Sequence, residues 1–143
     1  MKRILYFASP LFSVGEREYN LRVRSILDPY FNVYLPHVDG PFFPDLLAAG
    51  LDPAEAKKKI FVTDIEALKR CDLFLINLSG RTVDEGAAFE LGVAWNLGKP
   101  CYGLKEDIRQ LTAHGNNPMV DVALIHIFSD LHELSTWISD NKL

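Results

Sequence analysis

The sequence predicts an α/β fold in which helices cover both faces of a mostly parallel, five-stranded sheet. Three observations support this prediction. Apolar runs of strand length alternate with segments of helical pattern, an order that is typical of parallel sheets. The apolar runs are nearly continuous, as expected for strands that are buried on both faces. The chain has 143 residues, enough for one domain with its own core (residues 1–143) and too few for two.

Each expected strand is a short run rich in aliphatic and aromatic residues, bounded by turn-forming or polar residues. The carboxyl ends of the parallel strands meet at one edge of such a sheet, where ligands bind in open α/β folds. We therefore expect the functional residues just after the strands. The expected strands are Ile4–Ala8, Asn32–Leu35, Leu73–Leu78, Cys101–Leu104 and Ala123–Phe128.

Helix-start signals precede most of the segments between these strands. Ser13 with Glu16, and Thr82 with Glu85, have the spacing of a capping box, and Pro53 suits a first helical turn. The expected helices run from Ser13 to about Leu27, from Pro53 to Arg70 with one break near Phe61, from Thr82 through Glu90, and from Ser129 to near Asn141.

The segment from Pro36 to Asp52 is the exception, because it is rich in Pro, Gly and Phe and has no clear period. We expect a long loop there, beside the ligand site.

Composition and charge exclude several classes of partner. The formal net charge is −4 and no Lys/Arg run occurs, which argues against nucleic acid and anionic membranes. No apolar run approaches the roughly 18 residues of a membrane span.

Cys71 and Cys101 form neither a CxxC pair nor a Cys/His cluster. With no signal-peptide pattern at the N-terminus, we expect free thiols in a reducing cytoplasm.

Several common motifs are missing from the chain. It contains no GxGxxG, no GxxxxGK[ST] and no GxSxG, and the four His residues are scattered without the spacing of metal ligands. The first strand ends in Ala-Ser-Pro where a phospho-receiver domain has an acidic pair. We therefore expect neither a metal nor an organic cofactor.

With these motifs absent, acidic residues are the groups in the chain that could carry out chemistry. Glu90 lies at helical spacing from Ala87, Leu91 and Ala94, on a stripe that should face inward. A carboxylate there is costly unless it is hydrogen-bonded or functional. Asp84 lies at the expected turn from the strand into the same helix, so the two acids can converge on one pocket. Paired carboxylates without a metal motif suit displacement at an anomeric carbon, one attacking while the other handles the proton.

In order and spacing, several segments resemble the nucleoside 2-deoxyribosyltransferase family over most of the chain. This resemblance implies a flavodoxin-like fold and transfer of 2-deoxyribose from one nucleobase to another. The matching segments are Tyr6–Phe12, Pro36–Gly40, Asp64–Leu68 with Cys71-Asp72, Asp84–Gly86, Glu90–Ala94, Gly98–Pro100, Asp107–Arg109 and Asn117–Val120.

The resemblance also implies roles for individual residues. Glu90 falls at the nucleophile, Asp84 at the acid that handles the nucleobase and its proton, and Tyr6 at the tyrosine that hydrogen-bonds the nucleophile. Asp64 falls at an aspartate that binds in the same pocket. Asn117 falls at an asparagine that reaches the sugar hydroxyl in a neighbouring subunit, which implies a homo-oligomer.

Four further positions are predicted as substrate-binding residues. Gly86, Met119 and Asp39 lie in the matching segments. Phe12 is a loop aromatic that, like Phe42 and Phe43, could either stack on a base or cover the core. The segment around Asp39 departs from the family pattern. Many relatives have P-Q-R-D-G where this chain has Pro36-His37-Val38-Asp39-Gly40.

Two other functions stay open at this point. A related branch hydrolyses the N-glycosidic bond of deoxynucleosides or their 5′-monophosphates; Asp84 would repel a 5′-phosphate, which favours the transferase. A non-catalytic nucleotide-binding module could use the same acids for binding alone. The sequence does not distinguish a purine from a pyrimidine preference.

Overall fold

The computed structural model describes residues 1–140 and confirms the predicted α/β class. Five parallel strands form one sheet in the order β2-β1-β3-β4-β5. This is the order of flavodoxin-like folds, in which ligands bind at the point between β1 and β3 where the order of the strands reverses. The strands are β1 Ile4–Ala8, β2 Asn32–Tyr34, β3 Leu73–Asn77, β4 Cys101–Leu104 and β5 His126–Phe128.

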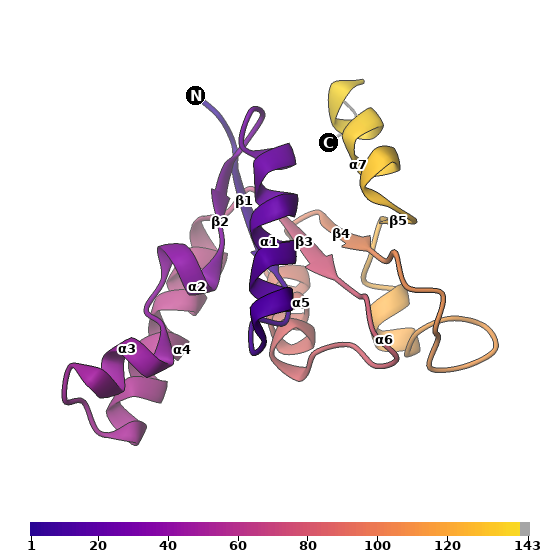
Figure 1. Cartoon of the computed structure of the whole chain (residues 1–143). Helices are drawn as coiled ribbons and strands as arrows, with labels where there is room; N and C mark the ends of the chain where they lie inside the picture. The colour runs from indigo at the N-terminus through magenta and orange to yellow at the C-terminus, as the bar shows by residue number, and fades with distance from the viewer. Residues whose placement is uncertain (141–143) are drawn as a thin grey trace.

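Helices cover both faces of this sheet, which makes three layers (Figure 1). On one face, α1 (Val14–Leu27) and α7 (Leu131–Ser139) pack over alternate strand residues such as Leu5 and Phe7. On the other face, α4 (Pro53–Arg70) and α5 (Glu85–Asn96) pack over Tyr6 and Ala8. The near-continuous apolar strands of the sequence are explained by this double burial.

The expected loop from Pro36 to Asp52 was wrong in part, because two short helices lie within it: α2 (Pro36–Asp39) and α3 (Phe43–Ala48). Each has a proline in its first turn, where the missing N–H costs nothing. Helix α4 is unbroken at Phe61, since no Gly or Pro interrupts it after its first residue.

Several helix and strand boundaries also differ from the expectation, and β2 and β3 each end one residue earlier than predicted. Asp84, not Thr82, caps α5, and Asp130, not Ser129, caps α7, because these carboxylates accept the backbone N–H groups of Ala87 and Glu133.

Strand β5 begins at His126, since the preceding residues form a turn after α6 (Pro118–Asp121). Within the described residues α7 ends at Ser139, and the expected end near Asn141 lies outside them. Among residues 1–140, no helix is both long and apolar enough to cross a bilayer.

Candidate active site

A cavity of about 690 Å³ lies at the carboxyl ends of the first three strands. It is lined by the segment after β1, by α2 and the start of α3, by one face of α4, and by the first turns of α5. This is the switch point of the sheet, where β1 lies between β2 and β3. The cavity contains three of the predicted acids: Asp64, Asp84 and Glu90.

Glu90 lies on α5 at the border between the buried stripe and the cavity. Ala87, Leu91 and Ala94 of the predicted stripe are buried, while Glu90 is partly exposed and lines the cavity. The hydroxyl of Tyr6 donates a hydrogen bond of 2.8 Å to Glu90 Oε1. Burial raises the pKa of Glu90 to about 8; Asp64 and Asp84 add to the rise, and the Tyr6 hydrogen bond opposes it. Glu90 therefore holds a proton at neutral pH.

Tyr6 is fully buried in β1, between the rings of Tyr34 on β2 and Phe74 on β3. The centroid distances are 5.2 Å to Tyr34 and 5.7 Å to Phe74. Burial and the nearby Glu90 raise the pKa of Tyr6 far above its ordinary value, so its hydroxyl stays a neutral donor. The sheet therefore fixes the direction of the donor that holds Glu90.

Asp64 reaches the cavity from α4 and accepts a 3.0 Å hydrogen bond from the Tyr34 hydroxyl. Burial raises the pKa of Asp64 to about 6, against the effect of this hydrogen bond. The backbone of Gly40 lies close to this hydrogen bond, and the absence of a side chain there leaves room for it. A Cβ atom there would lie 2.6 Å from the Tyr34 hydroxyl and 2.8 Å from the Pro36 carbonyl oxygen. A glycine at this position is thus a requirement of the Tyr34–Asp64 pair.

Asp84 has a structural contact and faces the cavity as well. Its Oδ2 atom accepts the Ala87 N–H at 2.9 Å and caps α5. Gly86, beside it, also lines the cavity, and a Cβ there would lie 3.3 Å from Asp84 Oδ2. Helix capping and a role in the site are therefore compatible, because the cap holds the carboxylate at the cavity wall.

Between α4 and α5 lies a second hollow, of about 380 Å³, which shares Asp64, Gly86 and Glu90 with the cavity. Phe61 and Phe89 lie at this hollow, with ring centroids 6.1 Å apart, and more than half of each side chain is exposed. Glu90 thus borders two openings.

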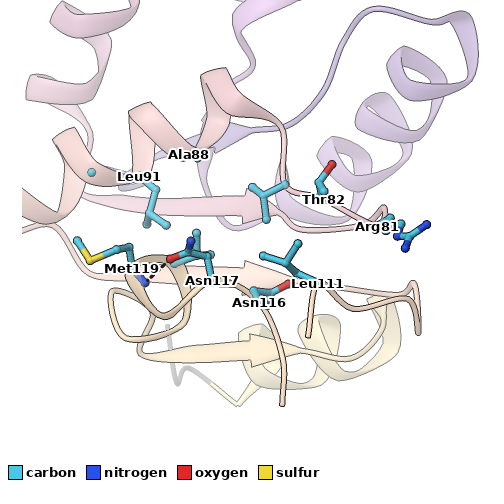
Figure 2. Close-up of a pocket in the computed structure, with 11 residues that line it drawn as sticks. Arg81, Thr82, Ala88, Leu91, Leu111, Asn116, Asn117 and Met119 are labelled. Carbon is cyan, nitrogen blue, oxygen red and sulfur yellow. Dashed lines mark hydrogen bonds between the residues drawn. The ribbon is translucent and has the colours of Figure 1, made fainter. Parts of the chain in front are cut away.

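Asn117 and Met119 lie elsewhere, around a separate cavity of about 460 Å³ on the other side of α5 (Figure 2). Asn117 caps α6 by accepting the Met119 N–H at 2.9 Å, and Met119 is 83% exposed. The structure does not bring these two predicted residues to the Glu90 cavity of the same chain.

Phe12 and Asp39 differ in their placement. Phe12 lines the Glu90 cavity and is mostly exposed. Asp39 is not among the lining residues; its carboxylate accepts from the Arg24 guanidinium and from the Leu35 N–H, both at 2.8 Å. Its described contacts brace α2 against α1.

Four polar residues that line the cavity were not among the predicted site residues: Ser9, Arg17, His37 and Lys57. Arg17 donates to the Leu11 carbonyl and lies over the Phe42 ring, and no ion pair of Arg17 or Lys57 occurs in the part of the chain that the structure describes. His37 carried the one available signal, since it stands where the expected family pattern has Gln.

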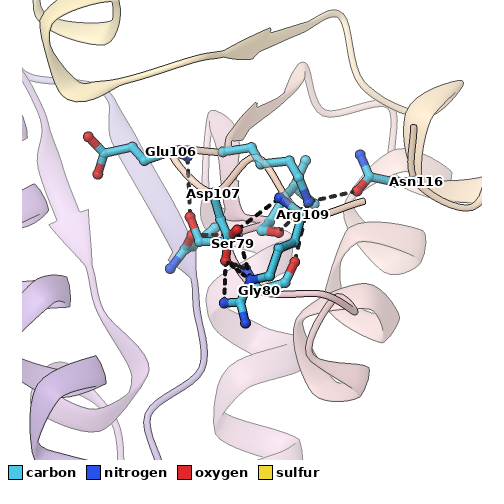
Figure 3. Close-up of polar contacts among 9 residues, drawn as sticks. Ser79, Gly80, Glu106, Asp107, Arg109 and Asn116 are labelled. Atoms are coloured by element: carbon cyan, nitrogen blue, oxygen red, sulfur yellow. Dashed lines mark hydrogen bonds and ion pairs between the residues drawn. The ribbon is translucent and has the colours of Figure 1, made fainter. Parts of the chain in front are cut away.

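The loop that leads to Asp84 is held from the side of β4 (Figure 3). Lys105 Nζ donates to the carbonyl oxygens of Leu78 and Gly80, at 3.2 and 3.4 Å. Asp107 accepts the Gly80 N–H and pairs with Arg109. The predicted Asp107–Arg109 segment therefore braces this loop.

Comparison with known proteins decides which family this site belongs to. A model of the nucleoside 2-deoxyribosyltransferase family matches residues 5–132. The chain belongs to this family. The resemblance predicted from the sequence is confirmed. No match was found among curated proteins.

Solved structures of similar fold include members of this family. A conserved protein from Enterococcus faecalis V583 is 27% identical, with a TM-score of 0.77 and 99% of each chain covered. The 2-deoxyribosyltransferase from Bacillus psychrosaccharolyticus is 24% identical, with a TM-score of 0.74, and the match covers 92% of this chain and 90% of that one. The CMP N-glycosidase BcmB from Clostridium botulinum is 18% identical, with a TM-score of 0.60, and covers 99% of this chain and 100% of its own. The last two support the fold.

Proposed function

We propose that this protein transfers 2-deoxyribose between nucleobases through a covalent glutamyl-deoxyribosyl intermediate. One observation carries the proposal: Glu90, held by Tyr6, lines a nucleoside-sized cavity together with Asp64 and Asp84. The family supports the substrate class, 2′-deoxynucleosides and free nucleobases.

In the first half-reaction, Glu90 attacks C1′ from the face opposite the base. The bond from C1′ to the base nitrogen breaks while a bond from C1′ to a Glu90 oxygen forms. The leaving base needs a proton, and the resting enzyme carries one on Glu90, because the pKa of this residue is about 8. Asp84 hydrogen-bonds the departing base and passes this proton to it.

In the second half-reaction, an acceptor base attacks C1′ of the ester from the side that the first base has left. Its proton returns to the carboxyl pair, and Glu90 is released. Two displacements give overall retention and ping-pong kinetics. The absence of an electron-withdrawing 2′-hydroxyl eases formation of the oxocarbenium-like transition state. The residues named here suffice for these steps, so the proposal includes no cofactor.

Asn117 and Met119 enter the proposal through a neighbouring subunit. Both surround a cavity on the far side of α5 from the Glu90 cavity and are exposed. We propose a homo-oligomer, a dimer or larger, in which these residues of one subunit complete the sugar site of another.

A base-exchange assay tests the proposal. Deoxyinosine or thymidine serves as donor and adenine or cytosine as acceptor, and both the new nucleoside and free deoxyribose are measured. Exchange in the wild type and its loss in Glu90→Ala are expected. Glu85→Ala is the matched control, because Glu85 is exposed on the same helix and is not among the residues that line the cavity. Free sugar as the sole product, whatever the acceptor, would contradict transfer.

Hydrolysis is the second candidate, and two observations favour it. The hollow between α4 and α5 gives water access to Glu90. Arg17 and Lys57 line the cavity and supply positive charge for a 5′-phosphate. The same assay with deoxynucleoside 5′-monophosphates as substrates distinguishes the two, since a hydrolase releases deoxyribose 5-phosphate without an acceptor base.

A non-catalytic nucleotide-binding module predicts a different result for the same variants. The wild type would then turn over no substrate, and Glu90→Ala would bind nucleosides with unchanged affinity.

A further inference from the structure

His37 has an unusual environment for a residue that lines the cavity. It lies in α2, directly after β2, and its side chain is half-buried. Its Nδ1 atom is buried without a hydrogen-bond partner, and it is the one buried side-chain nitrogen or oxygen in this condition among the described residues. No hydrogen bond of Nε2 is found among those residues either.

The orphaned Nδ1 indicates which tautomer the ring adopts. A buried N–H without an acceptor costs more than a buried lone pair without a donor, and orphaned buried N–H groups are correspondingly rare. The hydrogen therefore belongs on Nε2. Burial lowers the pKa of His37 from its ordinary value, and the charge of nearby Arg17 adds to this effect. The ring is thus neutral near pH 7 and offers a single N–H donor.

The order of the strands places this donor across the cavity from the acids. His37 follows β2, whereas Asp84 and Glu90 follow β3, and β1 lies between them. Neighbouring strands are about 4.8 Å apart, so the two strand ends are separated by roughly 10 Å. A nucleoside with C1′ at Glu90 and its glycosidic nitrogen at Asp84 spans this distance when its far edge extends toward α2.

We propose that His37 selects the nucleobase by donating a hydrogen bond from Nε2 to a carbonyl oxygen on the far edge of the base. This inference rests on the proposed function and names the substrates it prefers. An amino group at the same place would put one donor against another, and a site built around a buried polar group discriminates strongly against such a mismatch. The enzyme therefore favours keto bases over amino bases: deoxyinosine over deoxyadenosine, and deoxyuridine over deoxycytidine.

Steady-state kinetics with these two pairs of donor nucleosides test the proposal. In the wild type, kcat/KM for the keto substrate should exceed that for the amino substrate by roughly 10-fold or more. His37→Phe removes the donor and should bring the ratio to about 1, mainly through loss of activity on the keto substrate. His37→Gln restores a donor and should recover part of the preference. His132→Phe, at an exposed position on α7, is the matched control and should keep the wild-type ratio.

The proposal is wrong if the wild type shows no keto preference or if the preference survives in His37→Phe. Nuclear magnetic resonance of the imidazole nitrogens separates this failure from failure of the proposed function. The Nε2–H tautomer is expected in the free protein, and added hypoxanthine, but not adenine, should shift the His37 nitrogen signals. That outcome supports the role of His37 even if no deoxynucleoside is turned over. An Nδ1–H tautomer, or no response to hypoxanthine, overturns it.

Discussion

The hydroxyl of Tyr6 donates a 2.8 Å hydrogen bond to Glu90 Oε1, although 84 positions separate the two residues in the sequence. Tyr6 belongs to β1, an interior strand of the sheet, and is fully buried, whereas Glu90 belongs to α5 and borders the cavity. The position of the carboxyl group is therefore set by the sheet as well as by its own helix. Since the hydroxyl donates to the ionised form, it also limits how far burial raises the pKa of Glu90.

Removal of this hydroxyl should shift the pH dependence of the enzyme. In Tyr6→Phe the ring and its packing remain, but the carboxylate of Glu90 loses a donor, so its pKa rises further. A hydrogen bond to a charged group contributes about 1.5 kcal/mol or more, which corresponds to a displacement of the alkaline limb of kcat/KM by about one pH unit toward higher pH. Rate measurements between pH 5 and 10 check this. If the alkaline limb of kcat/KM stays at the same pH in Tyr6→Phe, it does not report the titration of Glu90.

The wild type should have a bell-shaped kcat/KM profile. The pKa of Asp64 is about 6 and that of Glu90 is about 8. Above pH 8, Glu90 loses the proton that the leaving base needs, and below pH 6, Asp64 is neutralised. Maximum activity is therefore expected between these values, with apparent pKa values that belong to the coupled acids. Asp64→Asn should remove the acid limb and, because the charge of Asp64 raises the pKa of Glu90, move the alkaline limb to lower pH; an unchanged acid limb would contradict its assignment.

Glu90→Gln should make the protein more stable at high pH while it abolishes turnover. The folded-state pKa of Glu90, about 8, lies above its unfolded value, so the folded state binds more protons and stability falls as pH rises toward 8. A neutral amide avoids this loss, with a gain on the order of 2 kcal/mol at pH 8.5 after allowance for partial exposure of the carboxyl group. At pH 4 the two proteins should be nearly equal. Thermal unfolding at both pH values provides the measurement; a less stable variant at pH 8.5 would argue that Glu90 is not destabilised by burial.

Mixed oligomers test the placement of Asn117. Asn117→Ala and Glu90→Gln should each be inactive alone, because one lacks the sugar contact and the other the nucleophile. After subunit exchange in a mixture, a dimer with one subunit of each kind regains one complete site, and about a quarter of wild-type activity is expected for random pairing into dimers. A mixture that stays inactive while mass measurements prove exchange would exclude a site shared between subunits.

Gly40→Ala should disturb both stability and the site. The new Cβ would collide with the Tyr34 hydroxyl and the Pro36 carbonyl, so the hydrogen bond from Tyr34 to Asp64 must break or move. A loss of about 1–3 kcal/mol in the free energy of unfolding is expected, together with lower kcat/KM. Gly15→Ala is the matched control, because nothing lies within 4 Å of a Cβ at that helical position. A control that loses as much stability as Gly40→Ala would remove the steric explanation.

The strands and the main helices followed from local pattern. Strand β1 was predicted with its observed bounds, because five consecutive apolar residues followed by Ser-Pro leave few alternatives. Ser13 was predicted as a cap and forms the capping box that its spacing with Glu16 indicated. Helices α2 and α3 were missed because their residues have no helical period, and each is stabilised by its proline and by packing near the cavity rather than by its own pattern.

The acids of the site and Tyr6 were predicted from the sequence, whereas Ser9, Arg17, His37 and Lys57 were not. Glu90 was conspicuous because a carboxylate interrupts an apolar stripe, and Asp84 because it precedes the same helix. Arg17 gave no signal, and His37 gave only a departure from the family pattern, because each lines the cavity only when α1 and α2 meet at the end of the sheet. Asp39 was carried over by resemblance, and its pairing with Arg24 depends on a contact between two helices that no local pattern reports.

Under the proposed mechanism, the two openings at Glu90 would make the ratio of exchanged nucleoside to free sugar depend on protein concentration. Glu90 lines both the main cavity and the hollow between α4 and α5, so the proposed sugar ester would be open to both. The exposed rings of Phe61 and Phe89 make this hollow an apolar surface, and covering it would be favourable because the rings would leave water. If a neighbouring subunit covers this hollow, dissociation of the oligomer on dilution would expose it and let water reach Glu90. The protein would then release more free sugar. The oligomeric state would then decide whether the same protein mainly exchanges bases or hydrolyses nucleosides.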